Sequence, residues 1–337
     1  TGMCGIAEVL LNLGYQVSGS DLQENEATIR LRNLGAQIFI GHSADNLKEA
    51  DVVVISSAVK EDNVEVARAK ALKIPVIPRA EMLAELMRMK YGIAVAGAHG
   101  KTTTTSMTAQ VLEAGGYDPT IIVGGRLNTV GSNAKLGEGD FIVAEADESD
   151  RSFLYLSPFI AVLTNIDEEH LDQYGTLNEI KKTFVYFANK VPFYCPVILC
   201  LDDPNLRSIM PQIERKVITY GFSPEADIQA RDFEFDGFSS YSTLYVHGQK
   251  AGRLELNVPG QHNILNALAA TAVGLDLDIE MQTILQALED YSGTGRRFEL
   301  KRVVNDIMII EDYAHHPTEI KATLQAARTG WKRRLVV

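Results

Sequence analysis

Residues 92–107 read GIAVAGAHGKTTTTSM, a short apolar run followed by glycines, a lysine and threonines. The apolar run is typical of a buried strand, and residues 101–114 predict a helix directly after it. The loop between them consists of Gly97, Ala98, His99, Gly100, Lys101 and Thr102. This GxxGKT pattern is two residues shorter between its glycines than the common GxxxxGKT phosphate loop. Because backbone N–H groups at a helix N-terminus face a bound anion, we expect the loop to hold phosphate.

Side chains of this loop predict nucleotide chemistry. Lys101 is placed to bridge the β and γ phosphates of ATP, and the Thr102 hydroxyl to ligate Mg²⁺. Thr103 opens a run of β-branched residues that form helices poorly, which favours a hydroxyl role near phosphate for at least one of them. The alternative is a glycine turn with a threonine helix cap.

Acidic residues follow a second apolar strand. The stretch FIVAEAD, 141–147, contains Glu145 and Asp147, and Glu148 comes directly after it. Magnesium prefers oxygen ligands, and metal carboxylates of α/β ATPases lie at the carboxyl ends of strands. A third strand, FIAVLTN at 159–165, leads to His170 among acids. Taken alone, the acids could be a solvated loop and the histidine a structural residue.

Composition limits the function classes. The net charge of −12 over 337 residues argues against a nucleic-acid surface, and the only basic cluster is at 332–334. The three cysteines contain no CxxC pair, which favours a reducing cytoplasm over a disulfide framework or a zinc knuckle, and we expect Cys195 and Cys200 to be buried, inert thiols. No apolar run approaches the roughly 18 residues of a membrane span, and we expect no signal peptide.

The rest of the chain alternates strands and helices, which predicts an α/β fold with parallel sheets. The first 21 residues resemble a nucleotide-binding βαβ unit whose first strand is absent, so we expect residues before Thr1 to be missing. Strands are expected at 36–41, 51–59 and 74–78, with helices at 63–72 and 80–89. We assign 1–90 to a Rossmann-like domain.

A second unit is expected over 91–294, with a parallel sheet and a further strand at 196–201. Residues 227–259 alternate in short runs, which predicts a small antiparallel sheet with a hairpin turn at 247–252. Helices follow at 263–275 and 279–290, and the stretch 292–297 is expected to be a hinge. Residues 295–337 then begin a third, Rossmann-like unit that is too short to close a core.

Six ordered motifs make these features specific: GAHGKTTTTSM, EADESDRSF, TNIDEEHLDQYG, GQHNILNALAA, GRRFE and DYAHHPTE. In this order they resemble the Mur ligases, and within them the branch that joins L-alanine to UDP-N-acetylmuramate. The branch that recycles murein tripeptide is less similar, since DEYD is expected there in place of DESD. The resemblance implies three domains, for the UDP-sugar, for ATP and for closure over ATP and the amino acid, in a bacterial cytoplasmic enzyme of cell-wall synthesis.

The resemblance implies roles for residues of the ATP site. Lys101 would neutralise charge on the transferred phosphoryl group, Thr102 and Glu145 would ligate one Mg²⁺, and His170 a second metal ion. The helix positions His262 and Asn266 resemble adenine contacts, although helix capping would also explain His262. The remaining assignments are Arg297 to phosphate and Asp312 to ribose.

The resemblance also implies substrate contacts. The diphosphate loop would be formed by Gly2, Met3, Cys4 and Gly5. The uridine would lie near Asp21, Ser56 and Ser57. The muramoyl group would be held by Asn128, Ser132 and Asn133. His315 and His316 would lie near the amino acid. The alternative for these polar residues on glycine-rich loops is that they only form turns.

Three departures from the family pattern concern Cys4, Glu311 and Ala314, where serine, aspartate and glycine are usual. The family's third domain also continues well past Val337, so we expect this chain to turn over poorly and extension to its natural end to raise turnover by orders of magnitude.

Two other function classes remain to be separated by experiment. A plain P-loop kinase or NTPase would explain the loop and the acids, but leaves the first domain unexplained. A non-catalytic dinucleotide sensor would explain the first domain, but not Lys101, Glu145 and His170. ATP consumption that depends on UDP-N-acetylmuramate would distinguish the ligase from both.

Overall fold

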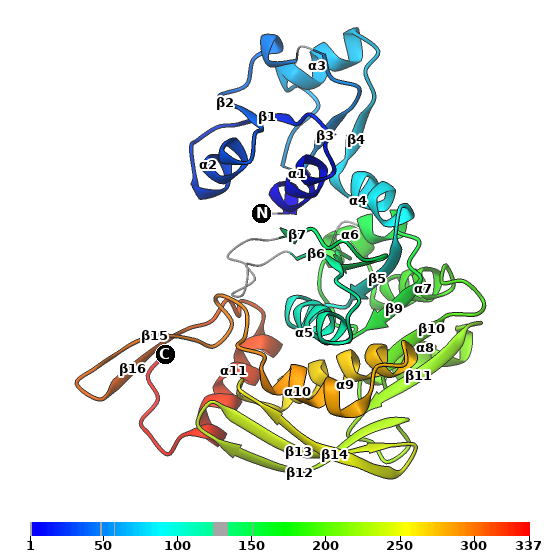
Figure 1. Ribbon diagram of the computed structural model, residues 1–337, viewed down its shortest axis with the longest axis vertical. Coiled ribbons are helices and arrows are strands. Elements are labelled where there is room, and N and C mark those ends of the chain that lie inside the picture. Colours follow the sequence, from blue (N-terminus) through cyan, green and yellow to red (C-terminus); the bar gives the residue numbers. More distant parts are fainter. Residues whose placement is uncertain (1, 48, 57, 124–133, 150) are drawn as a thin grey trace.

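The computed structural model describes residues 2–47, 49–56, 58–123, 134–149 and 151–337. An N-terminal α/β unit lies at one end of the molecule, a central unit forms the body, and the C-terminal segment lies against the central unit (Figure 1). The predicted α/β architecture is confirmed.

The N-terminal unit alternates helices and short strands, as predicted. Its elements are α1 (Gly2–Asn12), β1 (Ser18–Asp21), α2 (Glu26–Asn33), β2 (Gln37–Ile40), η1 (Ala44–Asn46), β3 (Val53–Ile55), α3 (Val64–Ala71), β4 (Val76–Pro78) and α4 (Arg79–Arg88). Strand β1 pairs in parallel with β2, and β3 with β4. Asparagine side chains cap two of the helices, Asn25 at α2 and Asn63 at α3, because a short amide accepts the first unpaired backbone N–H groups.

The central unit contains most of the secondary structure. Its elements are β5 (Tyr91–Ala96), α5 (Lys101–Ala114), β6 (Thr120–Ile122), β7 (Ala134–Lys135), β8 (Phe141–Ala146), η2 (Ser152–Tyr155), β9 (Ile160–Leu163), α6 (Leu171–Tyr174), α7 (Leu177–Ala188), β10 (Pro196–Cys200), α8 (Pro204–Ile209), η3 (Met210–Gln212), β11 (Lys216–Gly221), β12 (Ile228–Asp236), β13 (Ser239–Val246), β14 (Gln249–Leu256), α9 (Gln261–Asp276) and α10 (Met281–Glu289).

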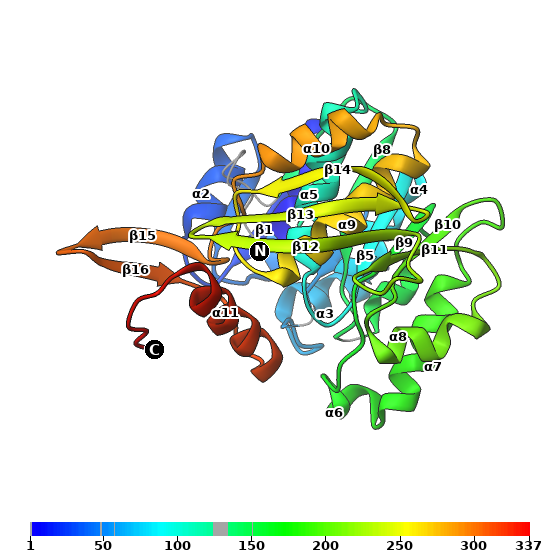
Figure 2. The same ribbon diagram turned by 90° about the horizontal axis from the view of Figure 1, so that it is seen from below.

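One sheet runs through this unit in the order β14-β13-β12-β11-β10-β9-β5-β8-β6-β7. In this order, the strands from β11 to β6 are parallel and mostly apolar. Strands β5, β9 and β10 are almost wholly buried because helices cover both faces of the sheet. Helices α5, α9 and α10 pack together on one face, and α7 and α8 lie on the other (Figure 2). The connection from β5 through α5 to β6 and those from β9 through α7 and α8 to β10 and β11 run in opposite directions along the sheet. Right-handed crossovers in opposite directions place their helices on opposite faces.

The predicted antiparallel region is formed by β12, β13 and β14, and it is continuous with the parallel sheet through the pairing of β11 with β12. The hairpin turn falls within the predicted range 247–252. His247 and Gly248 connect the strands with φ of 47° and 76°, the conformation of a tight two-residue hairpin turn.

The C-terminal segment consists of β15 (Glu299–Val304), β16 (Ile307–Glu311) and α11 (Pro317–Gly330), and residues 331–337 form no helix or strand. The β15–β16 hairpin projects from the body of the molecule in both views (Figures 1 and 2). Trp331 stacks on Phe298 with ring centroids 5.6 Å apart and also contacts Phe238, which fixes the end of α11 to the β12–β13 turn. This anchoring brings the start of α11 to the phosphate loop.

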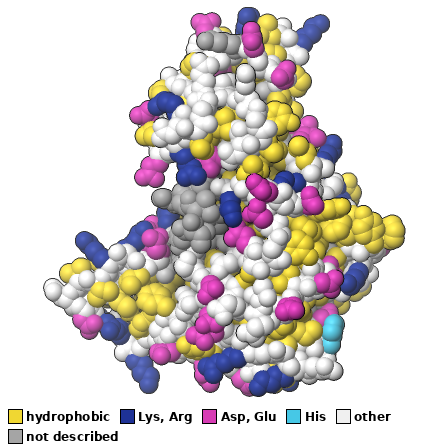
Figure 3. Space-filling model, in the orientation of Figure 1, with side chains coloured by type: hydrophobic (Ala, Val, Ile, Leu, Met, Phe, Trp, Pro, Cys, Tyr) yellow, Lys and Arg dark blue, Asp and Glu magenta, His cyan; other side chains and the backbone are white. Residues whose placement is uncertain are grey.

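Two further findings concern the surface and the thiols. An aromatic surface patch contains Tyr91, Phe159, Phe193 and Tyr194, in which each ring contacts at least one other. Hydrophobic side chains gather on one side of the face that Figure 3 shows. Cys195 and Cys200 are buried free thiols, as predicted.

Within the described part of the chain, no helix combines the length and apolar character that crossing a membrane requires.

Candidate active site

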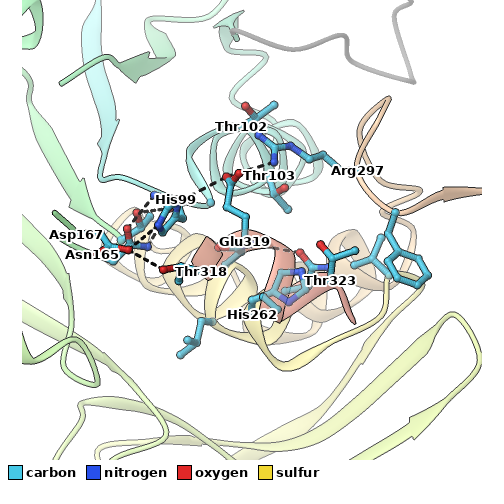
Figure 4. A pocket seen from close by; sticks show the side chains of 18 of the residues that line it. His99, Thr102, Thr103, Asn165, Asp167, His262, Arg297, Thr318, Glu319 and Thr323 are labelled. Atoms are coloured by element: carbon cyan, nitrogen blue, oxygen red, sulfur yellow. Dashed lines mark hydrogen bonds and ion pairs between the residues drawn. The ribbon is translucent and has the colours of Figure 1, made fainter. Parts of the chain in front are cut away.

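A cavity of about 410 Å³ lies beside the N-terminus of α5, between α9, α11 and the loop after β9 (Figure 4). It brings together residues from five of the six quoted motifs, all except EADESDRSF. The residues that line it include His99, Gly100, Thr102, Thr103, Asn165, Asp167, His262, Asn266, Arg297, Asp312 and Glu319. The phosphate loop therefore opens into a closed-sided pocket and not onto a flat surface.

Two glycines make the loop possible. Gly97 has a φ of +143°, and a Cβ there would lie 2.1 Å from the Thr164 hydroxyl. Gly100 caps α5 with a φ of +82°, and a Cβ there would lie 2.7 Å from Asn266 Oδ1. Only glycine adopts these conformations at low cost and leaves room for the neighbouring chain. Thr102 and Thr103 follow in the first turn of α5, where their backbone N–H groups point towards the cavity end of the helix.

Lys101 is held inside the loop by three acceptors. Its Nζ donates to the backbone carbonyls of Gly97 at 2.6 Å and Ala98 at 3.2 Å, and to Glu148 Oε1 at 2.9 Å. Burial alone would lower the pKa of Lys101, but the adjacent Glu148 carboxylate outweighs it and the pKa is raised. The side chain is therefore a fixed positive charge beside the phosphate-binding turn.

An acidic group lies next to Lys101. Ligand atoms of Glu148, Glu169 and His170 lie within 4.8 Å of one another, which is a spacing suited to a metal ion. The Glu148 carboxyl is almost completely buried, yet its Oε2 atom has no hydrogen-bond partner among the described residues. Tyr174 donates a hydrogen bond to the Glu148 backbone carbonyl and fixes its position. The oxygen-rich set and the unpaired buried oxygen fit a divalent cation.

His99 connects the phosphate loop to the loop after β9. Its Nε2 lies 2.9 Å from Asp167 Oδ2, and its backbone N–H donates to Asn165 Oδ1 at 2.8 Å. Burial lowers the pKa of His99, but the carboxylates of Glu319 and Asp167 outweigh that effect and the pKa is raised. The ring also stacks on His316, the residue that caps α11, with centroids 5.0 Å apart.

Glu319 reaches from α11 to a position between His99 and Arg297 (Figure 4). Its Oε1 lies 3.5 Å from His99 Nδ1 and 3.6 Å from Arg297 Nη1. Burial raises the pKa of Glu319, but these cationic neighbours and the His315 backbone N–H outweigh it and lower the pKa to about 2. The carboxylate therefore carries a negative charge in a pocket whose other features suit phosphate.

Helix α9 and the residues after β16 form further walls of the cavity. Burial lowers the pKa of His262 to about 4, so its ring is neutral near pH 7. Asn266 accepts a hydrogen bond from Thr104 at 3.1 Å and contacts the loop through Gly100. Asp312 lies at the cavity wall, where its carboxylate accepts hydrogen bonds from the backbone N–H groups of Phe298 and Ala314. A neutral ring and an amide on α9, with the Asp312 carboxylate near the hinge, suit a purine and its ribose.

Three family models match the chain. They are the Mur ligase family catalytic domain over residues 1–91, the Mur ligase middle domain over 95–274, and the Mur ligase glutamate ligase domain over 296–337. The UDP-N-acetylmuramate–L-alanine ligase of Geotalea daltonii is 59% identical over 336 residues, which cover 100% of this chain and 73% of that protein. The chain belongs to the Mur ligase family. The ligase of the same name from Trichlorobacter lovleyi is 61% identical over 338 residues, with 100% and 74% covered.

Solved Mur ligases share the fold. The UDP-N-acetylmuramate–alanine ligase of Thermotoga maritima superposes with a TM-score of 0.87 at 32% identity, covering 98% of this chain and 76% of that one. The UDP-N-acetylmuramate:L-alanyl-γ-D-glutamyl-meso-diaminopimelate ligase of Neisseria meningitides gives a TM-score of 0.80 at 30% identity, covering 88% and 96%.

Within this Mur ligase, the expected ATP residues lie around one site. Lys101, Thr102 and Thr103 begin α5, while His262, Asn266, Arg297 and Asp312 line the same cavity. His170 lies in the acidic group with Glu148. Glu145 lies on β8, opposite Val95 of β5, and is not part of that group, so its role as a metal ligand stays a prediction.

The predicted substrate residues are spread over the N-terminal unit. Gly2, Met3, Cys4 and Gly5 form the first turn of α1. Asp21 is the last residue of β1, and Ser56 directly follows β3. Ser57, Asn128, Ser132 and Asn133 lie outside the described residues. The two histidines of the C-terminal segment separate, since His316 contacts the phosphate loop while His315 is largely exposed. Their contact with substrate stays a prediction.

Several residues of the site were not singled out from the sequence. These are Asn165, Asp167, Glu169 and Glu319, together with Glu148, which was named among the acids after the strand but was given no role of its own. All five lie in motifs quoted for the family resemblance, so the available signal was their position beside a predicted ligand. Their spacing alone does not indicate which side chain faces the loop.

Proposed function

We propose that this chain catalyses the ATP-dependent joining of L-alanine to the lactyl carboxylate of UDP-N-acetylmuramate, with release of ADP and phosphate. The observation that carries the proposal is the Lys101–Glu148 pair at the phosphate loop, with His170 beside it. This pair occurs in a chain that is 59–61% identical, over its whole length, to proteins named UDP-N-acetylmuramate–L-alanine ligase.

The chemistry requires two steps. A carboxylate is a poor acylating agent, so its oxygen first attacks the γ-phosphorus of ATP, and the bond to ADP breaks. The resulting acyl phosphate has a good leaving group. The amine nitrogen of L-alanine then attacks the acyl carbon, the amine loses a proton, and the tetrahedral oxyanion collapses to the amide with loss of phosphate.

The residues of the pocket suit these steps. Lys101 places a fixed charge next to the loop where the β and γ phosphates would bind, and helix α5 presents its N-terminus to the same point. Arg297 lies across the cavity and would reach the phosphates from the hinge. His262 and Asn266 would contact adenine, and Asp312 the ribose.

Mg²⁺ is part of the proposal. Glu148, Glu169 and His170 would hold one ion, and the Thr102 hydroxyl, with or without Glu145, a second. Bound there, the metal would supply positive charge that lowers the repulsion between the substrate carboxylate and the triphosphate.

ADP release by the natural full-length protein tests the function. We expect release in the presence of Mg²⁺ and UDP-N-acetylmuramate to depend on L-alanine, and other amino acids and murein tripeptide to support less of it. Turnover with tripeptide in preference to L-alanine would assign the chain to the recycling branch. ATP hydrolysis that is indifferent to the UDP-sugar would refute the ligase proposal.

A further inference from the structure

A second group of side chains that could bind a metal ion includes His99 itself. Ligand atoms of His99, Glu169 and His316 lie within 4.8 Å of one another. His99 belongs to the phosphate loop, Glu169 follows β9, and His316 caps α11. The group therefore joins the central unit to the C-terminal segment, and it is separate from the Mg²⁺ ligands proposed above except for Glu169.

The hydrogen bonding of His99 leaves one ring nitrogen available. Nε2 lies 2.9 Å from Asp167 Oδ2, and a proton shared there orients the ring. Nδ1 is buried and has no hydrogen-bond partner among the described residues, while Glu319 Oε1 lies 3.5 Å away and Glu169 Oε1 4.0 Å away. A carboxylate–histidine pair with a free second nitrogen is the arrangement that supports metal-bound histidines in proteins.

The surrounding charge also favours a cation. The carboxylates of Asp167, Glu169 and Glu319 converge on the two imidazoles, and Arg297 is the cation beside them. A metal ion binds neutral imidazole, so in the metal-bound state these groups would sum to two negative charges, which a divalent ion would balance. His316 Nδ1 lies 3.5 Å from Glu169 Oε1 and 3.7 Å from Asp167 Oδ2.

We propose that His99 Nδ1, Glu169 and His316 form a binding site for a divalent transition-metal ion such as Zn²⁺. Asp167 would orient His99 through its hydrogen bond with Nε2. Two imidazoles and one carboxylate form a donor set that suits Zn²⁺ or Co²⁺ better than Mg²⁺, which prefers oxygen. Bonds of about 2.0–2.2 Å place ligand atoms roughly 3.4 Å apart. Because the ligand atoms lie within 4.8 Å of one another, each pair needs to approach by up to about 1.4 Å.

The bound ion would fasten α11 to the phosphate loop. Contacts already present at this junction are the ring stack of His99 and His316 and the ion pair of Glu319 with His99. In addition, Thr318 donates a hydrogen bond at 2.8 Å to Asp167 in the loop after β9. A metal bridge would add a ligand bond on each side of this junction. The site does not depend on the proposed ligase reaction, since its ligands can be tested without nucleotide.

Co²⁺ titration of the nucleotide-free, full-length protein, followed by its visible absorption, tests the site, with Zn²⁺ added as a competitor. We expect one saturable Co²⁺ band that Zn²⁺ removes. Loss of a ligand in His316→Ala should weaken binding by about tenfold or more, and Asp167→Asn, which leaves all three ligands, by about 10–100-fold.

Matched variants separate this site from its neighbours. His315→Ala removes an exposed histidine one residue away, and Glu168→Gln an acid next to Glu169, so both should leave the Co²⁺ band unchanged. His170→Ala should also retain the band, because His170 belongs only to the Glu148 group. Circular dichroism checks the fold of each variant.

Two outcomes would overturn the proposal. One is the absence of saturable Co²⁺ or Zn²⁺ binding by the folded protein. The other is binding that survives in His316→Ala but disappears in His170→Ala, which would place the ion in the Glu148 group. Neither outcome bears on ADP release with Mg²⁺, so failure of this site and failure of the ligase proposal are distinguishable.

Discussion

The Nζ atom of Lys101 lies 2.9 Å from Oε1 of Glu148, so the first residue of α5 is paired with an acid from the turn after β8. The pair leaves the second oxygen of Glu148 buried and unpaired beside Glu169 and His170. This geometry makes Glu148 the best-placed acid for a metal ion at the phosphate loop.

Glu148→Gln should therefore reduce kcat by about 100-fold or more, because metal charge stabilisation is worth several kcal/mol in the transition state. Glu145→Gln is the matched control, as it removes a nearby acid outside that group. Steady-state ADP release at varied Mg²⁺ measures both. A larger loss in Glu145→Gln than in Glu148→Gln would restore Glu145 as the principal ligand.

The two hinge arginines should differ. Arg297 lines the cavity and pairs with Glu319, whereas Arg296 pairs with the exposed Glu311 outside it. We expect Arg297→Ala to lower kcat/KM for ATP by about tenfold or more, as for loss of a charge-assisted phosphate contact. Arg296→Ala should stay within about twofold, since exposed ion pairs contribute about 0–1 kcal/mol. Equal losses would show that neither residue reaches phosphate directly.

Two glycines with the same φ give a test of the loop. Gly100 and Gly116 both have a φ of +82°, but a Cβ at Gly100 meets Asn266 at 2.7 Å while a Cβ at Gly116 meets nothing within 4 Å. Gly116→Ala should cost about 1–2 kcal/mol of unfolding free energy from backbone strain alone. Gly100→Ala should cost more and also weaken ADP binding at least tenfold. Urea unfolding and ADP titration measure these effects, and equal behaviour of the two variants would exclude the Asn266 contact as a constraint.

His262 should make stability depend on pH. Burial lowers its pKa to about 4 in the folded protein, while an unfolded histidine has a pKa near 6.5. The unfolded state thus binds more protons between these values, and the free energy of unfolding should fall as pH decreases from about 6.5 to 4. The loss attributable to this residue is at most about 3 kcal/mol.

Urea unfolding at pH 7 and pH 4.5 measures the effect, and His262→Gln provides the reference because glutamine does not titrate. Other groups contribute equally to both proteins, so the difference between their pH dependences isolates His262. Identical slopes would mean that the ring is solvated.

Local features were predictable because they depend on neighbours along the chain. The predicted helix over 101–114 coincides with α5, and the apolar run before it forms β5, since a buried strand and a glycine loop are encoded by consecutive residues. The tight turn at His247 and Gly248 was predictable for the same reason. Bounds of other elements shifted by a few residues, as in β3, where only Val53–Ile55 of the expected 51–59 pair with a neighbour.

The sequence did not predict which of the three acids after β8 would lie beside the phosphate loop. Glu145, Asp147 and Glu148 follow one another at the end of the same strand, and the direction of each side chain depends on how the turn after β8 packs. Buried Tyr174, from the short helix α6, holds the Glu148 backbone in place. No periodicity in 141–148 carries that information.

The sequence by itself determined the α/β fold, the phosphate loop and, through its ordered motifs, the kinship with Mur ligases. Only the tertiary structure decided that Glu148 pairs with Lys101 and that His316 and Glu319 meet His99, more than 200 residues earlier in the chain. The physical reason is that hydrogen bonding and turn conformation are set by residues close in sequence. Contacts across the cavity, by contrast, depend on how α11 is anchored by Trp331 and Phe298 against the central sheet.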